Sequence, residues 1–401
     1  MHECSDPPSI HGGDYDEGMS QQPFGDIPLF RELQKLLSSS EGPINLEIAR
    51  QVAGSIAVQD APRPSRDERL GSIFSEAVRS SEQVLSGYTG LQRDEPMMAR
   101  TIDRTGYASE TLDAWKWLLL KLFGHYSEQI TSLMGADEGA GASTKTVIEQ
   151  IGPLMFGLQA GTLVGQVARD ASSRYDPPIP RDDDGRVFVV EDVVQEIATG
   201  YSLDLHDFVR YLALHEGARH LILTASPWTT RYFRSLLTES IEATEIDVSD
   251  MERRLMDLQT QGQEALQEGF SVEQLLPIVP TDRHQRAVDR LKSFMAALDG
   301  YATHVMDQVG ERVLGTSERL EESMARRSAT PSDGRRMLTA LMGLTFDKSM
   351  TTSGTTFCSA IVKLRGIRSL NSIWEAPDNL PTLEEIRDPF TWMERVLPEE
   401  P

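Results

Sequence analysis

Apolar residues recur at intervals of three and four along most of the chain, which is the spacing of one face of an α-helix. Proline and glycine interrupt these stretches and mark their ends. The pattern predicts helices over 28–37, 42–57, 70–88, 110–134, 205–223, 229–245, 251–269, 281–312 and 334–342, followed by a segment over 355–366. A short apolar run at 187–190 (VFVV) is expected to be extended and to lead into a helix from Glu191. Other strand signals are scarce, so the predicted fold class is mainly α with little or no β structure.

One further helix is expected over 151–168, where eighteen residues carry no charge. Its length lies at the lower limit for a bilayer span, and Gly157, Gly161 and Gly165 form a ridge of small residues at four-residue spacing. Gln159 and Gln166 keep its hydrophobicity modest. We therefore interpret the segment as a core helix packed tightly against a neighbour, and we expect no membrane span.

Changes in composition divide the chain into three parts. Residues 1–22 are acidic and rich in Gly, Pro and Gln, which predicts a disordered tail. A helical region follows over 23–134, and a second one, which carries the motif described below, runs over 145–401. A Gly/Ala-rich link at 135–144 is the expected hinge between them. One continuous domain made of both helical regions is the alternative to this division.

Charge and cysteine content exclude several classes of function. The formal net charge is −23, and nucleic acids and anionic membranes bind to positive surfaces, so we expect neither as a partner. Cys4 and Cys358 are the only cysteines, too few for a disulfide framework or a cysteine metal site. The N-terminus has no basic stretch followed by an apolar run, so no signal peptide is predicted. These features favour a cytoplasmic protein.

Residues 211–223 (YLALHEGARHLIL) contain a departure from the zinc-protease helix motif H-E-x-x-H. In that motif two histidines four residues apart bind the metal, and the glutamate is the general base. His215 and Glu216 are present, but Arg219 stands at the second histidine position, and His220 comes one residue later. A four-residue step turns about 40° around a helix and a five-residue step about 140°. In a regular helix, His215 and His220 therefore cannot bind one zinc ion.

Several segments in the same order resemble an actinobacterial family of zinc-dependent metalloproteases (hydrolase-like, zincin-like proteins), one branch of which is associated with coenzyme F420 biosynthesis. The similar segments are 24–37 (FGDIPLFRELQKLL), 42–53 (GPINLEIARQVA), 153–168 (PLMFGLQAGTLVGQVA), the motif helix with Pro227-Trp228, 298–310 (LDGYATHVMDQVG), 373–382 (IWEAPDNLPT) and 387–396 (RDPFTWMERV). Together they span about residues 23–397. The resemblance implies a mainly helical, cytoplasmic, zincin-like domain whose protease assignment depends on the helix motif.

The resemblance also assigns roles to residues of the motif. His215 falls on the first metal-ligand position and Glu216 on the general-base position. Arg219 occupies the second ligand position and cannot donate a lone pair, because its guanidinium stays protonated. The family commonly has a glutamate, taken as the third ligand, where this chain has the shorter Asp299. We therefore expect Arg219 to replace the charge of the metal by pairing with Glu216 or Asp299.

An unusual zinc site is the alternative to this hypothesis. Acidic side chains on the next helix and histidines near the motif could complete an unusual zinc site if helix packing brought them together. These alternative ligands are His220, Glu239, Glu242 and His304. A third possibility is an Arg219 side chain that points to solvent and has no role.

Three functions follow from these alternatives. The first is a zincin-like protein with a degenerate H-E-x-x-R motif, in which metal-dependent peptide hydrolysis is impaired or lost. The second is an active zinc metallopeptidase with an unusual ligand set, in which Glu216 would take a proton from a zinc-bound water. The third is a non-catalytic module that binds a peptide or a protein. Zinc is the only cofactor that the motif suggests, and the sequence does not determine whether it is bound or which oligomer forms.

Overall fold

The computed structural model describes residues 42–59, 61, 68–134, 141–247, 250, 253, 278–279, 281–314, 317–342 and 348–398. The predicted acidic tail, the predicted helix over 28–37 and nearly all of the predicted helix over 251–269 lie outside these residues. So do residues 135–140 of the predicted hinge, whereas residues 141–144 already belong to a helix.

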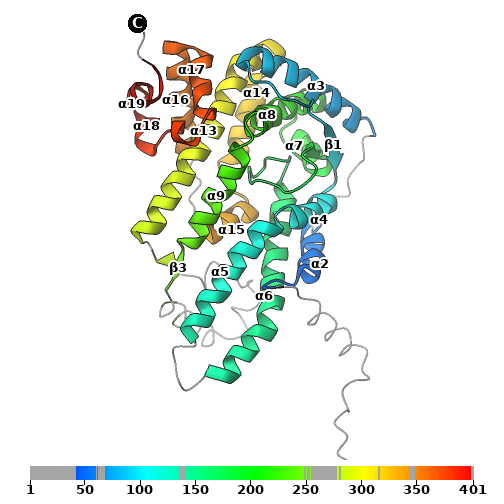
Figure 1. Ribbon diagram of the computed structural model, residues 1–401. Coiled ribbons are helices and arrows are strands. Elements are labelled where there is room, and N and C mark those ends of the chain that lie inside the picture. The colour runs from blue at the N-terminus through cyan, green and yellow to red at the C-terminus, as the bar shows by residue number, and fades with distance from the viewer. Residues whose placement is uncertain are drawn as a thin grey trace, which may run out of the picture.

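The described residues form a mainly helical fold, and the predicted fold class is confirmed. Figure 1 shows α5 and α6 side by side, with their ends at residues 134 and 141 reaching beyond the other helices, while α2 packs along α6. The helices are α2 (Leu46–Ala57), α3 (Leu70–Thr89), α4 (Arg104–Ala114), α5 (Lys116–Met134), α6 (Gly141–Asp170), α7 (Glu191–Gly200), α8 (Leu205–Ala225), α9 (Thr229–Glu242), α13 (Asp282–Val313), α14 (Ser317–Ser328), α15 (Asp333–Leu341), α16 (Lys348–Arg365), α17 (Ile367–Asn371), α18 (Leu383–Arg387) and α19 (Pro389–Val396), with 3-10 turns η1 (Ser372–Trp374) and η2 (Pro377–Asn379).

Two small sheets account for the described strands. Strand β1 (Ala99–Ile102) pairs in parallel with β2 (Val187–Val190), with Ala99 opposite Val187. The predicted extended run at 187–190 is thus confirmed, and all four of its residues are buried. Strands β3 (Glu245–Ile246) and β4 (Ile278–Val279) form a short antiparallel pair.

Several predicted helix boundaries were wrong. Helix α6 begins at Gly141 rather than at residue 151, and α16 begins at Lys348 rather than at residue 355. The helix predicted over 42–57 begins at Leu46, because the Asn45 side chain caps it by accepting the Ile48 N–H at 3.1 Å. The helix predicted over 110–134 is two helices, α4 and α5, which meet at Trp115. Trp115 is almost fully buried, and its backbone angles leave the helical region at that point. Tertiary packing of a large side chain therefore interrupts a continuous apolar pattern.

The glycine ridge of α6 packs against α2. A Cβ atom added to Gly161 would lie 2.6 Å from the Ala49 carbonyl oxygen, and one added to Gly157 would lie 2.6 Å from that of Asn45. Among the described helices, the Ile151–Asp170 part of α6 is the one long and apolar enough to cross a membrane, and 44% of its apolar window is buried in the chain. The ridge thus serves packing within the chain, as the core-helix interpretation predicts.

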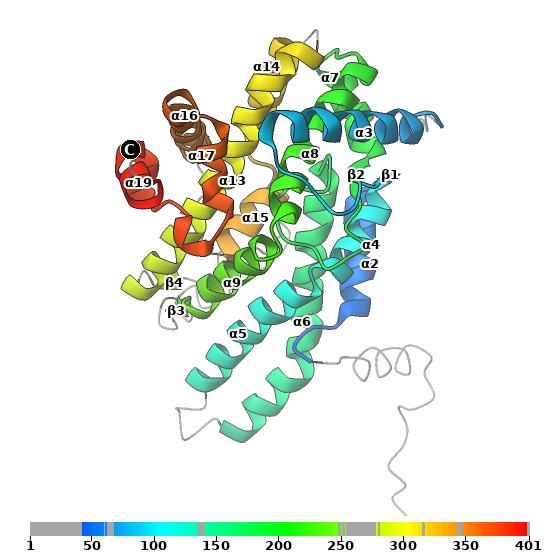
Figure 2. The same cartoon turned by 45° about the horizontal axis from the view of Figure 1, so that its top comes forward.

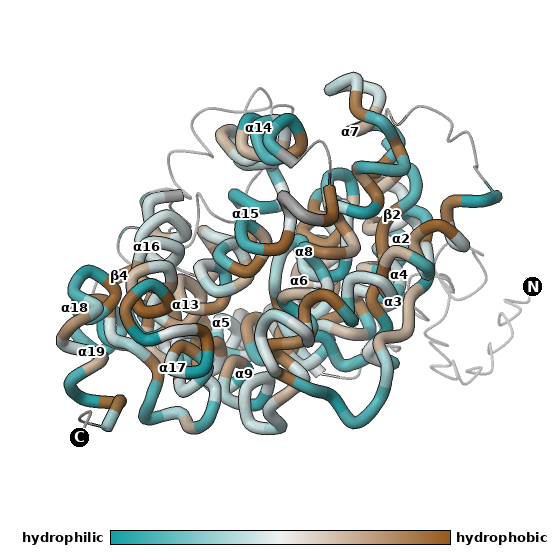
Figure 3. Tube along the Cα trace, turned by 90° about the horizontal axis from the view of Figure 1, so that it is seen from above, coloured by the Kyte–Doolittle hydropathy of each residue, from teal (hydrophilic) through white to brown (hydrophobic). Residues whose placement is uncertain are grey.

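Helix α8 lies at the centre of the hydrophobic core. It packs against α3 on one side and α13 on another, and Figure 2 shows it below α3. Every residue from Glu216 to Leu223 is buried. Hydrophobic segments gather around α8 and β2 when the molecule is viewed from above (Figure 3). The motif is therefore carried by a core helix held rigidly on several sides.

Candidate functional site

Regular geometry in α8 determines which motif residues share a face. Asp204 caps the helix by accepting the Asp207 N–H at 3.0 Å, and α8 continues without interruption to Ala225. His215 and Arg219, four residues apart, therefore lie together on the face toward α13, as their hydrogen bonds below show. His220 lies on a different face, as the five-residue step predicts.

Arg219 joins α8 to α13 through an ion pair with Asp299. Its Nε and Nη2 donate to the Oδ1 atom of Asp299 at 3.0 and 2.8 Å. Only 9% of Arg219 is exposed, so the pair is largely removed from water. Burial alone would lower the pKa of Arg219, but the carboxylates of Asp299 and Glu216 raise it above its ordinary value. The guanidinium is therefore a permanent cation between the two helices.

His215 completes the contact on the other side of the guanidinium. The Nη1 atom of Arg219 lies 2.5 Å from Nε2 of His215. Burial, and after it the charge of Arg219, lower the pKa of His215, so its imidazole is neutral at pH 7. The same Nη1 atom lies 2.7 Å from Nδ1, so a neutral ring can accept the arginine N–H through either nitrogen. The Oε1 atom of Glu216 lies 3.5 Å from Nδ1, beyond hydrogen-bond distance. His215 also stacks on Tyr211, and its side chain is 28% exposed.

Glu216 is fully buried and only half satisfied by hydrogen bonds. Its Oε2 atom accepts the backbone N–H of Tyr175 at 2.8 Å. Its Oε1 atom has no hydrogen-bond partner among the described residues. A buried carboxylate oxygen is costly to leave unpaired. The glutamate is thus held in place beside His215 with one acceptor available.

His220 belongs to a separate buried group behind the motif. The hydroxyl of Tyr175 forms a hydrogen bond with its Nδ1 atom at 2.7 Å. Burial lowers the pKa of His220 to about 3, and the positive charges of Arg93 and Arg174 add to the effect. Tyr175 therefore contacts two motif residues: Glu216 through its backbone N–H and His220 through its side chain.

We expect His220 to make the protein sensitive to acid. The unfolded chain protonates this histidine near pH 6.5, whereas the folded chain does so at about 3. Between these values the unfolded state binds more protons, so the free energy of unfolding falls as the pH decreases from about 6.5 toward about 3. The slope from one such group is at most about 1.4 kcal/mol per pH unit.

Urea unfolding between about pH 7 and pH 4 measures this effect. A His220→Asn variant should lose less stability over the interval than the unmodified protein. A His206→Asn variant is the matched control, because His206 lies on the same helix with an exposed side chain. Equal acid dependence in the His220 variant and the unmodified protein would contradict the prediction.

The structure does not bring the alternative ligands to the motif. Glu239 pairs with Arg290 at 2.7 Å, and Glu242 pairs with Lys121. His304 bonds to the Tyr88 hydroxyl at 3.0 Å through Nε2 and to the Ser359 hydroxyl at 2.9 Å through Nδ1. Within the described part of the chain, no three His, Cys, Asp or Glu residues are grouped so that they could hold a metal ion.

Zinc does not fit the cluster in its present arrangement. A catalytic zinc needs three protein ligands and an open fourth position. The two candidate ligands that lie together, His215 and Asp299, both bind the Arg219 guanidinium. A divalent ion between them would have to displace this cation, since two positive charges cannot share the position.

Tyr175 is the residue of this cluster that the sequence did not reveal. It lies between α6 and β2, in a stretch without helical or strand periodicity, and forty-one positions separate it from Glu216. No motif marks a backbone N–H as the partner of a distant carboxylate. The partnership of Arg219 with Asp299, eighty positions apart, was one of the two pairings expected from the sequence.

Comparisons with known proteins agree with the fold and with the resemblance to a zincin-like family. The model of the zincin-like metallopeptidase family matches residues 44–393. A crystal structure from Chloroflexus aurantiacus, described as a candidate hydrolase with a novel fold, is similar with a TM-score of 0.60 and 24% identity. The similarity covers 89% of this chain and 100% of that one, and at this identity it shows the fold alone. No curated protein matches the chain. Because the family model spans most of its length, the chain belongs to the zincin-like metallopeptidase family.

Proposed function

We propose that this protein is a zincin-like family member in which the Arg219 guanidinium replaces the metal cation, and in which metal-dependent peptide hydrolysis is impaired or lost. One observation carries the proposal: the guanidinium is buried between His215 and Asp299, the two residues expected to bind the metal. A guanidinium binds carboxylates with several N–H groups, so it can hold the two helices together as a metal would.

The cation also balances charge in the core. Glu216 of α8 and Asp299 of α13 place two carboxyl groups near the contact between these helices, and Glu216 has no exposed surface. Buried carboxylates need a compensating positive charge or hydrogen bonds. Arginine supplies this charge permanently, so the arrangement does not depend on metal supply. Under this proposal the protein acts by binding a peptide or a protein rather than by hydrolysis.

A second candidate is an active zinc metallopeptidase with an unusual ligand set. The unpaired Oε1 atom of Glu216 beside His215 favours it, since a general base needs such a free acceptor. This candidate requires Arg219 to leave its present position and a third ligand to move to His215 and Asp299. The separate positions of Glu239, Glu242, His220 and His304 make it the less supported of the two.

We also propose a cytoplasmic setting. It is supported by a free, buried Cys358 and by the acidic composition of the chain. An actinobacterial origin and a place in the F420-associated branch remain predictions from the resemblance.

Metal content of the purified protein tests the main proposal, measured by mass spectrometry beside an Arg219→His variant. We expect no zinc in the unmodified protein and close to one zinc per chain in the variant, because the substitution restores H-E-x-x-H. Arg210→His is the matched control, since Arg210 lies on α8 with its side chain mostly in solvent.

Stoichiometric zinc in the unmodified protein would overturn the proposal and favour the active peptidase. Zinc in the Arg210 control but not in the Arg219 variant would show adventitious binding. Absence of zinc from every variant would contradict the view that His215 and Asp299 retain the positions of metal ligands.

A further inference from the structure

A basic turn stands out on this acidic protein. Residues 326–336 (RRSATPSDGRR) contain four arginines and a single acidic residue, in a chain with a net charge of −23. The segment includes the end of α14 and the start of α15. Arg326 and Arg336 pair with acids of their own helices, Glu322 and Asp333. Arg327 and Arg335 instead turn toward the body of the protein.

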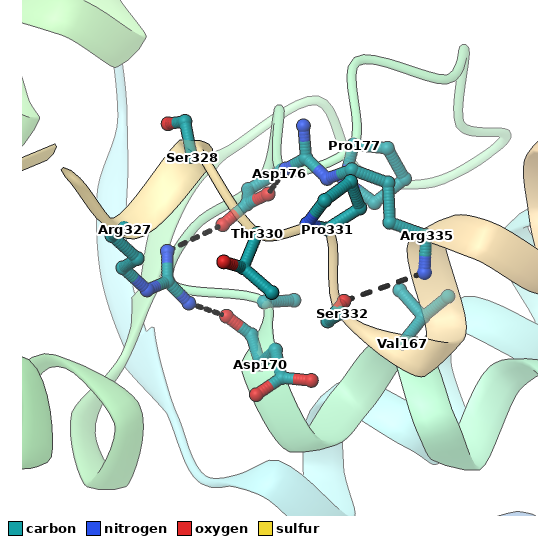
Figure 4. Close-up of a pocket in the computed structure, with 11 residues that line it drawn as sticks. Val167, Asp170, Asp176, Pro177, Arg327, Ser328, Thr330, Pro331, Ser332 and Arg335 are labelled. Atoms are coloured by element: carbon teal, nitrogen blue, oxygen red, sulfur yellow. Dashed lines mark hydrogen bonds and ion pairs between the residues drawn. The ribbon is translucent and has the colours of Figure 1, made fainter. Parts of the chain in front are cut away.

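Arg327 and Arg335 line a cavity of about 110 Å³. Its walls come from the C-terminal end of α6, the loop that carries Asp176 and Pro177, and the turn between α14 and α15. Figure 4 shows the two guanidinium groups reaching Asp176 from different sides, with Thr330 between them. Ser328, Thr330 and Ser332 add hydroxyl groups to the lining. The cavity is large enough for a small polyatomic ion and is rich in donors.

Asp176 does not occupy all the hydrogen-bond donors of the two arginines. Its Oδ1 atom lies 2.5 Å from Nη2 of Arg335, and its Oδ2 atom lies 3.5 Å from Nη1 of Arg327. Oδ2 also accepts the backbone N–H and the hydroxyl of Ser172 at 3.0 and 2.9 Å. Both arginines hold the pKa of Asp176 well below its usual range, so it carries one negative charge against two positive ones. The distance to Arg327 exceeds that of a hydrogen bond.

Asp170 is the other carboxyl group at the cavity. Burial raises its pKa, although Arg327 and a hydrogen bond from Ser332 oppose the shift. Arg327 donates to the backbone carbonyl of Asp170. The cavity therefore carries two guanidinium groups and two carboxyl groups. An incoming anion would bind through the guanidinium N–H groups and the hydroxyl groups of the lining rather than through an excess of positive charge.

The N-terminus of α15 also provides a favourable electrostatic environment for an anion in the cavity. Ser332 caps the helix, and the unpaired N–H groups of a helix N-terminus attract anions. Gly334 holds that end against α6, because a Cβ atom there would lie 2.4 Å from the backbone nitrogen of Val167. The N-terminus is thus fixed beside the cavity rather than free to move away.

We propose that this cavity binds a small tetrahedral oxyanion of the phosphate class, held by Arg327 and Arg335. Guanidinium groups bind phosphate oxygens in pairs, and hydroxyl groups can bond to the remaining oxygens. The site is separate from the motif cluster and does not depend on the proposed loss of metal. Asp176 adjoins Tyr175, whose N–H supports Glu216, so an anion here would lie next to the support of the motif helix.

Isothermal titration with sodium phosphate tests the proposal, with sodium chloride keeping the ionic strength constant. The full chain should bind about one phosphate, and Arg335→Gln and Arg327→Gln should each weaken binding roughly tenfold or more, as expected for loss of a charged hydrogen bond. Arg336→Gln and Arg326→Gln are matched controls. Each removes the same charge one position away, from a side chain that does not line the cavity.

Sulfate and acetate titrations define the ligand class. Binding of phosphate and sulfate, but not acetate, is the expected result for a tetrahedral oxyanion site. Absence of phosphate binding to the unmodified chain at millimolar concentration would overturn the proposal, and so would equal losses in the control variants. Phosphate should also raise the thermal midpoint of the unmodified chain but not that of Arg335→Gln, which distinguishes a lost site from a misfolded variant.

Discussion

Replacing Gly300 by alanine is expected to destabilise the protein by about 3 kcal/mol or more. Gly300 of α13 crosses Gly354 of α16 so closely that an added Cβ atom would lie 2.2 Å from the Gly354 carbonyl carbon. A Cβ atom on Gly354 would lie 2.0 Å from the Ala296 carbonyl oxygen. Both obstacles are backbone atoms of helices, so no side chain can rotate away and the two helices must separate.

Gly310→Ala is the matched control for this substitution. Gly310 lies on the same helix, and no described atom lies within 4 Å of the position that its Cβ would take. Alanine favours the helical conformation over glycine by about 1 kcal/mol, so this variant should be neutral or slightly more stable. Urea unfolding followed by circular dichroism measures both. Similar stabilities for the two variants would show that the α13–α16 crossing tolerates separation.

The same substitution should disturb the motif cluster. Asp299 precedes Gly300, so a displaced α13 carries the carboxylate away from Arg219. The Arg219–Asp299 contact and the glycine crossing thus place two constraints on one turn of α13.

Helical periodicity was sufficient to predict the fold class and to predict which motif residues lie on the same face of their helix. The placement of His220 away from His215 follows from counting residues along a helix, and the buried Tyr175–His220 contact agrees with it. The break at Trp115 could not be predicted in the same way, because both sides of it have helical spacing. Local pattern gives no measure of how a large side chain packs in three dimensions.

Long-range partners were harder to infer than local structure. The sequence narrowed the partner of Arg219 to Glu216 or Asp299 by their charge and position, and the guanidinium donates to Asp299. Nothing comparable identified Tyr175 as the support of Glu216, since any residue can offer a backbone N–H. The sequence also did not predict the arginine-lined cavity, because the cavity forms only where α6, the loop at Asp176 and the α14–α15 turn meet.

Removing the Arg219 side chain is expected to be the second large perturbation. Arg219→Ala leaves the buried Glu216 and the partly buried Asp299 without their common cation. Breaking a buried ion pair by deleting one partner costs about 3–5 kcal/mol. We expect the lower end of this range, since Asp299 keeps some contact with water. Urea unfolding at neutral pH gives the free energy directly.

Two further variants separate the role of this cation from that of a surface arginine. Arg290→Ala removes an exposed pair with Glu239 between α13 and α9, and should cost less than about 1 kcal/mol. Arg219→Ala combined with Asp299→Ala should cost less than the sum of the single changes, because the second change removes a carboxylate already left unpaired. If Arg219→Ala cost no more than Arg290→Ala, the guanidinium would not be holding α8 to α13. The proposed function requires the Arg219 guanidinium to hold the two helices together as a metal would. Equal costs for Arg219→Ala and Arg290→Ala would therefore also remove the main support for that proposal.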